Sequence, residues 1–202
     1  MARPRRPTAN SRDGFSAIEL LFVAAAIVTV GGIAVPPLVG AVEDYRAAGA
    51  ARFLSARLQR ARMEAVLRSR DVALRFTAVD GRYAFATFAD GNGNGVLARD
   101  IERGIDRPLG EEERLGDSFR GVDLGTLPGL PAVDAGSPAP GDDPVRLGAS
   151  DGVTFTAAGS SSSGSLYVRG RGQRQFVVRI FGDTGKTRVL RFDATHRIWR
   201  PL

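Results

Sequence analysis

The first long element of the chain begins at Arg12-Asp13-Gly14-Phe15-Ser16-Ala17-Ile18-Glu19-Leu20-Leu21-Phe22, where a basic leader meets an apolar run. From Leu20 to Val42 no side chain is charged, and at about 1.5 Å per residue a helix of this length covers roughly 35 Å, enough to cross the core of a bilayer. Four arginines stand in the leader, at Arg3, Arg5, Arg6 and Arg12. By the positive-inside rule they keep the N-terminus in the cytoplasm, so we expect one membrane-spanning helix with the rest of the chain beyond the membrane.

One carboxylate, Glu19, stands at the edge of this apolar run. A carboxylate in hydrocarbon is costly unless it is paired or neutralised, so an intramembrane acid indicates a function. No basic residue between Phe15 and Val42 can pair with it within one chain. Two interpretations follow: Glu19 pairs with a group on another molecule, or it lies at the level of the lipid headgroups and contacts water.

The segment Gly14-Phe15-Ser16-Ala17-Ile18-Glu19 at the start of an apolar helix resembles the signal of type IV prepilins. The resemblance implies that a prepilin peptidase cuts between Gly14 and Phe15 and methylates the new amine of Phe15, while the helix is retained. It also implies that Glu19 pairs with the free amine of Phe15 on a neighbouring pilin or pseudopilin subunit during assembly. On this interpretation the chain divides into a leader (1–14), a transmembrane and assembly helix (15–42) and a periplasmic head (43–202).

Two prolines, Pro36 and Pro37, interrupt the apolar run shortly after Gly31-Gly32. Proline lacks the backbone N–H and its ring clashes with the preceding turn, so we expect a kink in the helix near residues 32–37. In pilins a proline in this region marks the place where the helix bends, and Pro36 stands at the matching position.

The charge of the chain is unevenly distributed. The 202 residues carry a net charge of +6, but without residues 1–14 the balance falls to 24 basic and 21 acidic side chains, or +3. Residues 90–143 hold twelve acids and five arginines (−7), whereas residues 165–202 hold nine basic residues and two acids (+7). The chain has no cysteine, which excludes a disulfide framework and thiol chemistry. Its length suits one domain plus the anchor.

The hydrophobic pattern after the anchor predicts an α+β head. Residues 43–70 continue as a helix, in which Leu54, Leu58, Ala61 and Ala65 form one apolar stripe. A hairpin follows, with strands in residues 72–76 and 82–88 joined at Asp80-Gly81. Four later strands are expected at residues 152–156, 165–169, 175–181 and 187–192, with a further pairing segment at 197–200. The prediction is a long N-terminal helix packed on an antiparallel sheet.

Between the two groups of strands, residues 90–148 are rich in glycine, proline and acid, which predicts a long mobile loop. Its start, Asp90-Gly91-Asn92-Gly93-Asn94-Gly95, has oxygen ligands at alternate positions and a glycine at the sixth, like the opening of an EF-hand loop. The twelfth position is Ile101, where a bidentate Glu is required. Asp90, Asn92, Asn94 and Asp100 are therefore the candidate calcium ligands, and a glycine-rich turn without metal is the alternative.

Several segments of the head are similar to the GspH/FimT family of minor pilins and pseudopilins. They are Leu58 to Ala65, Asp90-Gly91-Asn92-Gly93, Ser161-Ser162-Ser163-Gly164-Ser165-Leu166 and Gly185-Lys186-Thr187-Arg188-Val189-Leu190. The resemblance implies a minor pseudopilin of a type II secretion system, or a minor pilin of a type IV pilus. In either case it implies a single-pass protein of the bacterial inner membrane with a periplasmic head, whose partners are other subunits and the prepilin peptidase.

Some pilus members of this family bind DNA through a C-terminal Gly-Arg-x-Arg turn. The chain has Gly185-Lys186-Thr187-Arg188 there, and Lys offers a point charge without the planar fork of Arg. The candidate DNA-binding residues are Lys186, Arg188 and Arg191, since basic side chains attract phosphates in any sequence. The alternative is an ordinary β-turn with solvated cations.

No arrangement of residues indicates an enzyme. The single histidine, His196, has no cysteine or second histidine with which to bind zinc. Gly93-x-Gly95 lacks the parallel βαβ context of a dinucleotide site, and Asp90, Asp100 and Glu102 would repel a pyrophosphate. We expect no catalytic residue and, apart from the calcium candidate, no cofactor.

Overall fold

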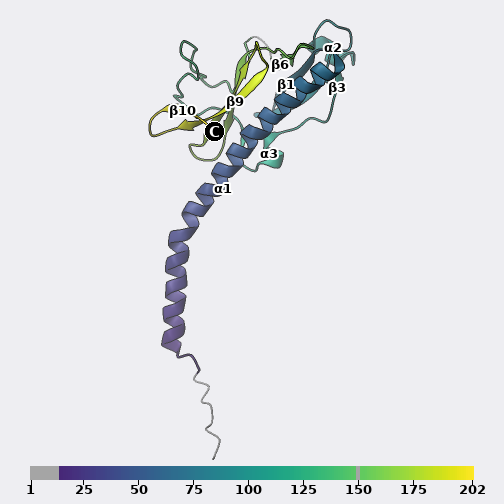
Figure 1. The fold of residues 1–202 in the computed structure, drawn as a ribbon. Helices are drawn as coiled ribbons and strands as arrows, with labels where there is room; N and C mark the ends of the chain where they lie inside the picture. Colours follow the sequence, from purple (N-terminus) through teal and green to yellow (C-terminus); the bar gives the residue numbers. More distant parts are fainter. Residues whose placement is uncertain (1–13, 149–150) are drawn as a thin grey trace, which may run out of the picture. The chain divides into compact units, whose positions relative to one another are not determined.

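A computed structural model describes residues 14–148 and 151–202, and for Val35 and Pro36 it describes the backbone alone (Figure 1). The leader arginines lie outside the described residues. The chain forms two units, Met1–Ala41 and Val42–Leu202, which are described separately. Helix α1 (Ala17–Arg68) contributes to both.

In the first unit, α1 carries apolar side chains, and none of those that the structure describes is buried. An 18-residue window has a mean hydropathy of 2.4 with no buried residue, so by length and composition this helix can cross a membrane. Pro36 and Pro37 lie inside α1, and the backbone is helical at both. The kink at these prolines stays a prediction.

In the second unit, the head, α1 buries one face completely. The predicted stripe is confirmed: Leu54, Leu58, Ala61 and Ala65 are at most 1% exposed. Alanines at positions 47, 48, 50 and 51 precede the stripe and are buried as well, which lets strands approach the helix closely. The helix ends at Arg68, two residues before the predicted end.

The first sheet has the strand order β3-β2-β1-β6. Its strands are β1 (Val72–Val79), β2 (Arg82–Ala89), β3 (Arg107–Pro108) and β6 (Gly152–Phe155). The predicted hairpin is confirmed, because β1 and β2 pair in antiparallel register from Val72↔Ala89 to Val79↔Arg82.

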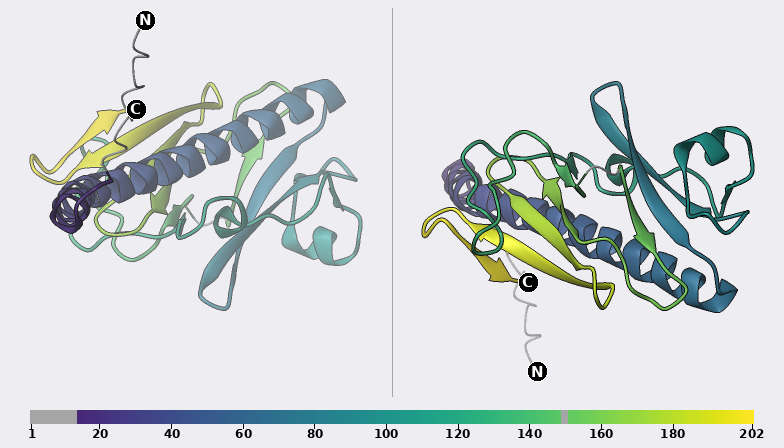
Figure 2. Two further views of the ribbon diagram at one scale, coloured as in Figure 1. Left: turned by 90° about the horizontal axis from the view of Figure 1, so that it is seen from below. Right: turned by 90° about the horizontal axis from the view of Figure 1, so that it is seen from above.

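The second sheet has the order β10-β9-β8-β7-β4, with β5 also paired to β7. Its strands are β4 (Asp123–Leu124), β5 (Val145–Arg146), β7 (Gly164–Arg169), β8 (Gln175–Phe181), β9 (Lys186–Asp193) and β10 (Ile198–Pro201). Figure 2 shows this sheet beside the first part of the head helix, and the β1–β2 hairpin beside its last part. Both sheets are antiparallel throughout, so the predicted α+β class is confirmed.

The main hydrophobic core lies between α1 and both sheets. A smaller cluster lies on the opposite face of the second sheet, where Leu130 packs with Tyr167, Val177 and Leu190. The segment around Leu130 thus covers the outer face of this sheet.

The long segment predicted as a mobile loop contains short regular elements. These are β3, β4 and β5, with helices α2 (Ala98–Glu102) and α3 (Leu115–Ser118). Several of its apolar side chains are buried in the head, namely Leu115, Val122, Leu124, Leu130 and Leu147.

Two turns join the sheets to each other and to α1. The Ser161 N–H donates to the Gly182 carbonyl (2.7 Å), and the Gly182 N–H donates to Ser163 Oγ (2.9 Å). From α1, Arg62 Nε donates to the carbonyl of Gly159 (2.8 Å) and Gln59 Nε2 donates to that of Gly185 (3.0 Å). The serine-rich segment and the Gly185 turn are therefore structural joints of the head.

Candidate functional site

The start of α1 is closed by a reciprocal cap. The Ser16 hydroxyl accepts the Glu19 N–H, and the Glu19 carboxylate accepts the Ser16 N–H, each at 3.3 Å. This is a capping box, in which Ser and Glu three residues apart satisfy two backbone donors at the helix start. Glu19 thus has a local structural role, and its role in assembly stays a prediction.

Gly14 and Phe15 precede α1 and lie outside its hydrogen-bonded turns. The Phe15 side chain is 78% exposed, and nothing lies within 4 Å of a Cβ placed on Gly14. The bond between these two residues therefore lies in an open segment before the helix, and cleavage there stays a prediction. The side chains of the helix that follows are also exposed, including Ile18, Leu21, Phe22, Ile27, Val28 and Ile33.

The head begins with a cluster of ion pairs at the first charges after the apolar run. Arg174 Nε lies 2.7 Å from the Asp44 carboxylate, and Arg191 Nη2 lies 3.4 Å from it. Arg171 Nη1 lies 3.3 Å from Glu43. These contacts attach the β7–β8 turn and β9 to the first turn of the head helix.

The candidate calcium ligands lie close together, with Asp90, Asn92 and Asn94 in the loop after β2 and Asp100 in α2, and N–H groups surround the two carboxylates. Asp90 accepts the backbone N–H groups of Asn92, Gly93 and Gly95 at 2.8–3.0 Å. Burial alone would raise the pKa of the Asp90 carboxyl, but these backbone donors together outweigh it and the pKa is lowered.

The second carboxylate, that of Asp100 in α2, accepts hydrogen bonds from the two asparagines. Asp100 Oδ2 accepts Asn94 Nδ2 (2.9 Å) and Asn92 Nδ2 (3.4 Å), and the hydrogen bond from Asn94 is the main cause of a lowered pKa at Asp100. In residues 14–148 and 151–202, no group of three His, Cys, Asp or Glu side chains has the arrangement of a metal site. Calcium at this loop stays a prediction.

The candidate DNA-binding residues lie on two faces of β9. Thr187 bonds Ser55 of α1 and Arg191 pairs with Asp44, so odd-numbered residues of this strand face the helix. Lys186 and Arg188 lie on the other face, because side chains alternate along a strand. There Arg188 stacks on the Phe181 ring, with its Cζ 5.7 Å from the ring centre. The structure brings Lys186 and Arg188 together and separates Arg191 from them.

Comparison with known families identifies the head. The family model described as type II transport protein GspH matches residues 50–184, which run from the head helix to the turn after β8. The chain belongs to the GspH family.

Two solved structures are similar to this GspH-family chain, both of the minor pseudopilin EpsH from the type II secretion system of Vibrio cholerae. The first is 18% identical in sequence, with a TM-score of 0.44, and the match covers 72% of this chain and 97% of the EpsH chain. The second is 17% identical, with a TM-score of 0.38, and the match covers 78% of this chain and 93% of the EpsH chain. Among curated proteins, no sequence matches the chain.

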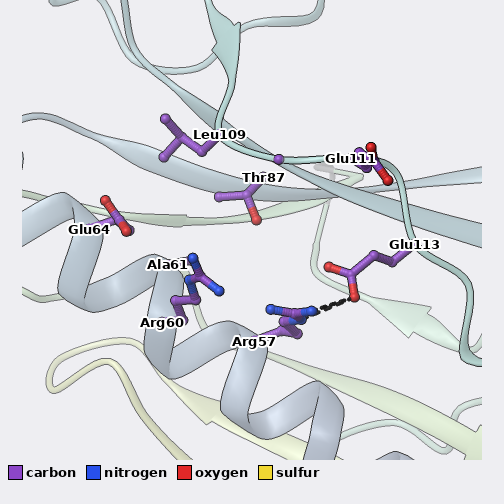
Figure 3. A pocket seen from close by; sticks show the side chains of 9 residues that line it. Arg57, Arg60, Ala61, Glu64, Thr87, Leu109, Glu111 and Glu113 are labelled. Carbon is purple, nitrogen blue, oxygen red and sulfur yellow. Dashed lines mark hydrogen bonds and ion pairs between the residues drawn. The ribbon is translucent and has the colours of Figure 1, made fainter. Parts of the chain in front are cut away.

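The GspH-family head has an open cleft of about 380 Å³ between α1 and β2. Figure 3 shows Arg57 of α1 meeting Glu113 from the segment after β3, with Nη2 and Oε2 2.7 Å apart. Arg60, Glu64 and Glu111 also line the cleft. The Arg57–Glu113 pair is partly exposed and connects the segment after β3 to the helix, so its role is structural.

The sequence did not reveal two groups that position this head. Asp106, 1% exposed, accepts the N–H groups of Gly91 and Leu97 and thereby closes the Asp90 loop. Gln175, fully buried, accepts the Leu127 N–H and donates to the Gly125 carbonyl. Both act on backbone groups distant in sequence, for which no local pattern exists.

Proposed function

We propose that this chain is a minor pseudopilin of a type II secretion system, with an assembly role and no catalysis. The observation that carries the proposal is the GspH-family match over the head, which follows an exposed apolar helix with a prepilin-type start. In this proposal the helix holds the precursor in the inner membrane, with the N-terminus in the cytoplasm and the head in the periplasm. A prepilin peptidase cuts between Gly14 and Phe15 and methylates Phe15, and the mature chain then joins other pseudopilins.

In this proposal Glu19 aligns the incoming subunit by pairing with the Phe15 amine of a neighbour. The capping box offers a way to separate that role from the local one, because Gln also serves at the third position of such a cap. Glu19→Gln keeps a cap and removes the charge, whereas Glu19→Val removes both.

We expect both variants to be processed like the wild type and to be lost from filaments isolated from cells that carry the other pseudopilins and the peptidase. The measurement is the ratio of filament-associated to membrane-associated chain, with the amount of processed chain as the control. Normal incorporation of Glu19→Gln together with loss of Glu19→Val would show that Glu19 acts only as a cap, which would contradict the pairing role.

A second candidate function is a type IV pilus minor pilin that binds DNA. The observation in its favour is the exposed pair Lys186 and Arg188 beside Phe181, because cations and an aromatic ring on one face suit phosphate and base contacts. The full chain in detergent would bind duplex DNA with a steep salt dependence, weakened by Lys186→Ala and by Arg188→Ala. Arg191→Ala is the matched control, since that residue lies on the opposite face. Equal affinity in all three variants and the wild type would refute this function.

A further inference from the structure

A hollow of about 610 Å³ in the head is lined by cationic side chains. Four arginines contribute to it from separate segments, namely Arg82, Arg120, Arg169 and Arg171. The lining includes one carboxylate, Asp123, which lies opposite Arg169 in the β4–β7 pairing. We call this site the basic hollow.

The glycine-rich backbone beneath the basic hollow lets the arginines lie flat along it. A Cβ placed on Gly121 would lie 2.5 Å from Arg171 Nε, and one placed on Gly125 would lie 3.4 Å from the Arg169 Cβ. Arg171 and Arg169 thus pack against this glycine backbone, where a side chain in place of Gly121 would displace the Arg171 guanidinium. Arginine in this arrangement is suited to phosphate, whose oxygens it binds through several N–H groups.

The position of the basic hollow follows from contacts within the head. Arg171 pairs with Glu43, and a Cβ on Gly170 would lie 2.8 Å from the Ala47 Cβ. Glu43 is the first charged residue after the apolar run, and Ala47 follows Val42 by a rise of about 7.5 Å along a helix. The headgroup layer of a bilayer is about 5–7 Å deep on each side. A helix that leaves the hydrocarbon near Val42 therefore brings this wall of the hollow to the headgroups.

Positive charge exceeds negative charge at this level of the head. Glu43 and Asp44 are the acids, and the cluster around them contains Arg171, Arg174 and Arg191. Arg46, also exposed, lies two residues after Asp44 and has no ion-pair partner among the described residues. The acids therefore do not neutralise the arginines that surround them.

We propose that the basic hollow binds the phosphates of anionic phospholipid headgroups and so holds the head against the membrane surface. The inference rests on the membrane anchoring in the proposed function. The anchor favours lipid over other phosphates, because tethering keeps headgroups at a high effective concentration beside the site. Attraction of arginine to an anionic leaflet is electrostatic and falls off within a Debye length, so the contact weakens as salt rises. A subunit that leaves the bilayer for a filament must release this contact between the basic hollow and the headgroups.

The test is amide hydrogen exchange of the full chain in lipid nanodiscs, made of phosphatidylcholine alone or with phosphatidylglycerol added. We expect amides of residues 120–125 and 169–173 to exchange about fivefold more slowly in the anionic discs, as one arginine contact to an anionic surface would give. Added salt should remove the difference. Arg120→Gln combined with Arg169→Gln should remove it as well, while Arg60→Gln combined with Arg103→Gln, an equal charge change outside the hollow, should preserve it.

Equal exchange in the two kinds of disc would overturn the proposal, as would an equal loss of slowing in both double variants. The same slowing by inorganic phosphate in phosphatidylcholine discs would assign the hollow to free anions, and slowing by duplex DNA alone would assign it to nucleic acid. Matching unfolding temperatures of the variants would show that they fold. A chain that does not enter either disc would instead refute the membrane anchoring in the proposed function.

Discussion

Gly185 shows how much of the head depends on one residue of a turn. Its φ of +61° lies in the left-handed region, and a Cβ there would lie 2.4 Å from the Gly159 carbonyl oxygen and 2.9 Å from Arg62 Nε. Two costs therefore add at this position, the conformational strain of a side chain at positive φ and a clash with backbone.

Gly185→Ala should lower the free energy of unfolding by about 3 kcal/mol, measured by chemical denaturation. Gly81→Ala is the matched control, since Gly81 has a φ of +72° with nothing within 4 Å of the added Cβ. That variant should lose only about 1 kcal/mol, the strain alone. Equal losses in the two variants would show that the joint at Gly185 has room for a side chain.

The lowered pKa of Asp90 makes the stability of the head depend on pH. A carboxyl with a folded pKa below its unfolded value stabilises the fold above the unfolded pKa, and this contribution is lost as the pH falls through the folded pKa. The unfolding temperature should stay level from pH 7 to pH 5 and fall below about pH 4. Asp90→Asn should have a shallower fall in the acid range, and a fall as steep as that of the wild type would contradict this account.

Asp193 adds a second acid-sensitive contact at the C-terminal hairpin. A hydrogen bond from His196, together with the neighbouring Arg200, lowers the pKa of Asp193 to about 2. Like Asp90, Asp193 stabilises the fold above its unfolded pKa, and this stabilisation is lost as the pH falls through its folded pKa. The fall of the unfolding temperature in acid therefore includes both residues in the wild type and Asp193 alone in Asp90→Asn.

At the scale of residues, the sequence predicted which side chains of the Asp90 loop gather but not their hydrogen bonds. Asp90, Asn92 and Asn94 lie close to Asp100 as expected, and the Asp90 carboxylate accepts backbone N–H groups of its own loop. Those backbone donors arise from the conformation of the loop, which residue types at alternate positions do not specify. The separation of Arg191 from Arg188 could have been predicted from the sequence. Both residues lie in a predicted strand, and side chains three positions apart in a strand face opposite sides of the sheet.

At the scale of elements, long periodic patterns predicted structure well and short segments did not. The head helix and β8 match the predicted ranges closely, and β7 and β9 differ by a residue at their ends. The strands β3, β4 and β5 have two residues each and were not predicted. A strand of two residues is too short to have a pattern of alternating polar and apolar side chains. Its pairing, such as Asp123↔Arg169, depends on a partner distant in sequence.

Gln175 attaches the segment after β4 to the second sheet. Its side chain is fully buried, accepts the Leu127 N–H at 2.9 Å and donates to the Gly125 carbonyl at 3.0 Å. Gln175→Leu keeps the volume and leaves these backbone groups unpaired, so we expect a loss of about 3 kcal/mol in the free energy of unfolding.

The same substitution should speed amide exchange in residues 125–131 more than elsewhere, because that segment loses its anchor. The neighbouring Gln173 is exposed, and Gln173→Leu should change stability by less than about 0.5 kcal/mol. Unchanged exchange in residues 125–131 of Gln175→Leu would mean that packing around Leu130 alone holds the segment.

At the scale of the whole molecule, the two units differ in whether their apolar side chains are exposed or buried. Residues 17–41 form an exposed apolar helix, and residues 42–202 form a head with its own core. This division suits a chain that is first held in a membrane and later packed into a filament, because the same exposed apolar surface can contact lipid and then other helices. We propose that the start of this helix is a prepilin processing site.

The most direct test of that claim is the intact mass and N-terminal residue of the chain recovered from cells that carry its prepilin peptidase. We expect a chain that lacks residues 1–14 and begins at methylated Phe15. An intact Met1 start, or cleavage beyond Val42, would show that the apolar helix is an ordinary anchor or an export signal and would contradict the account.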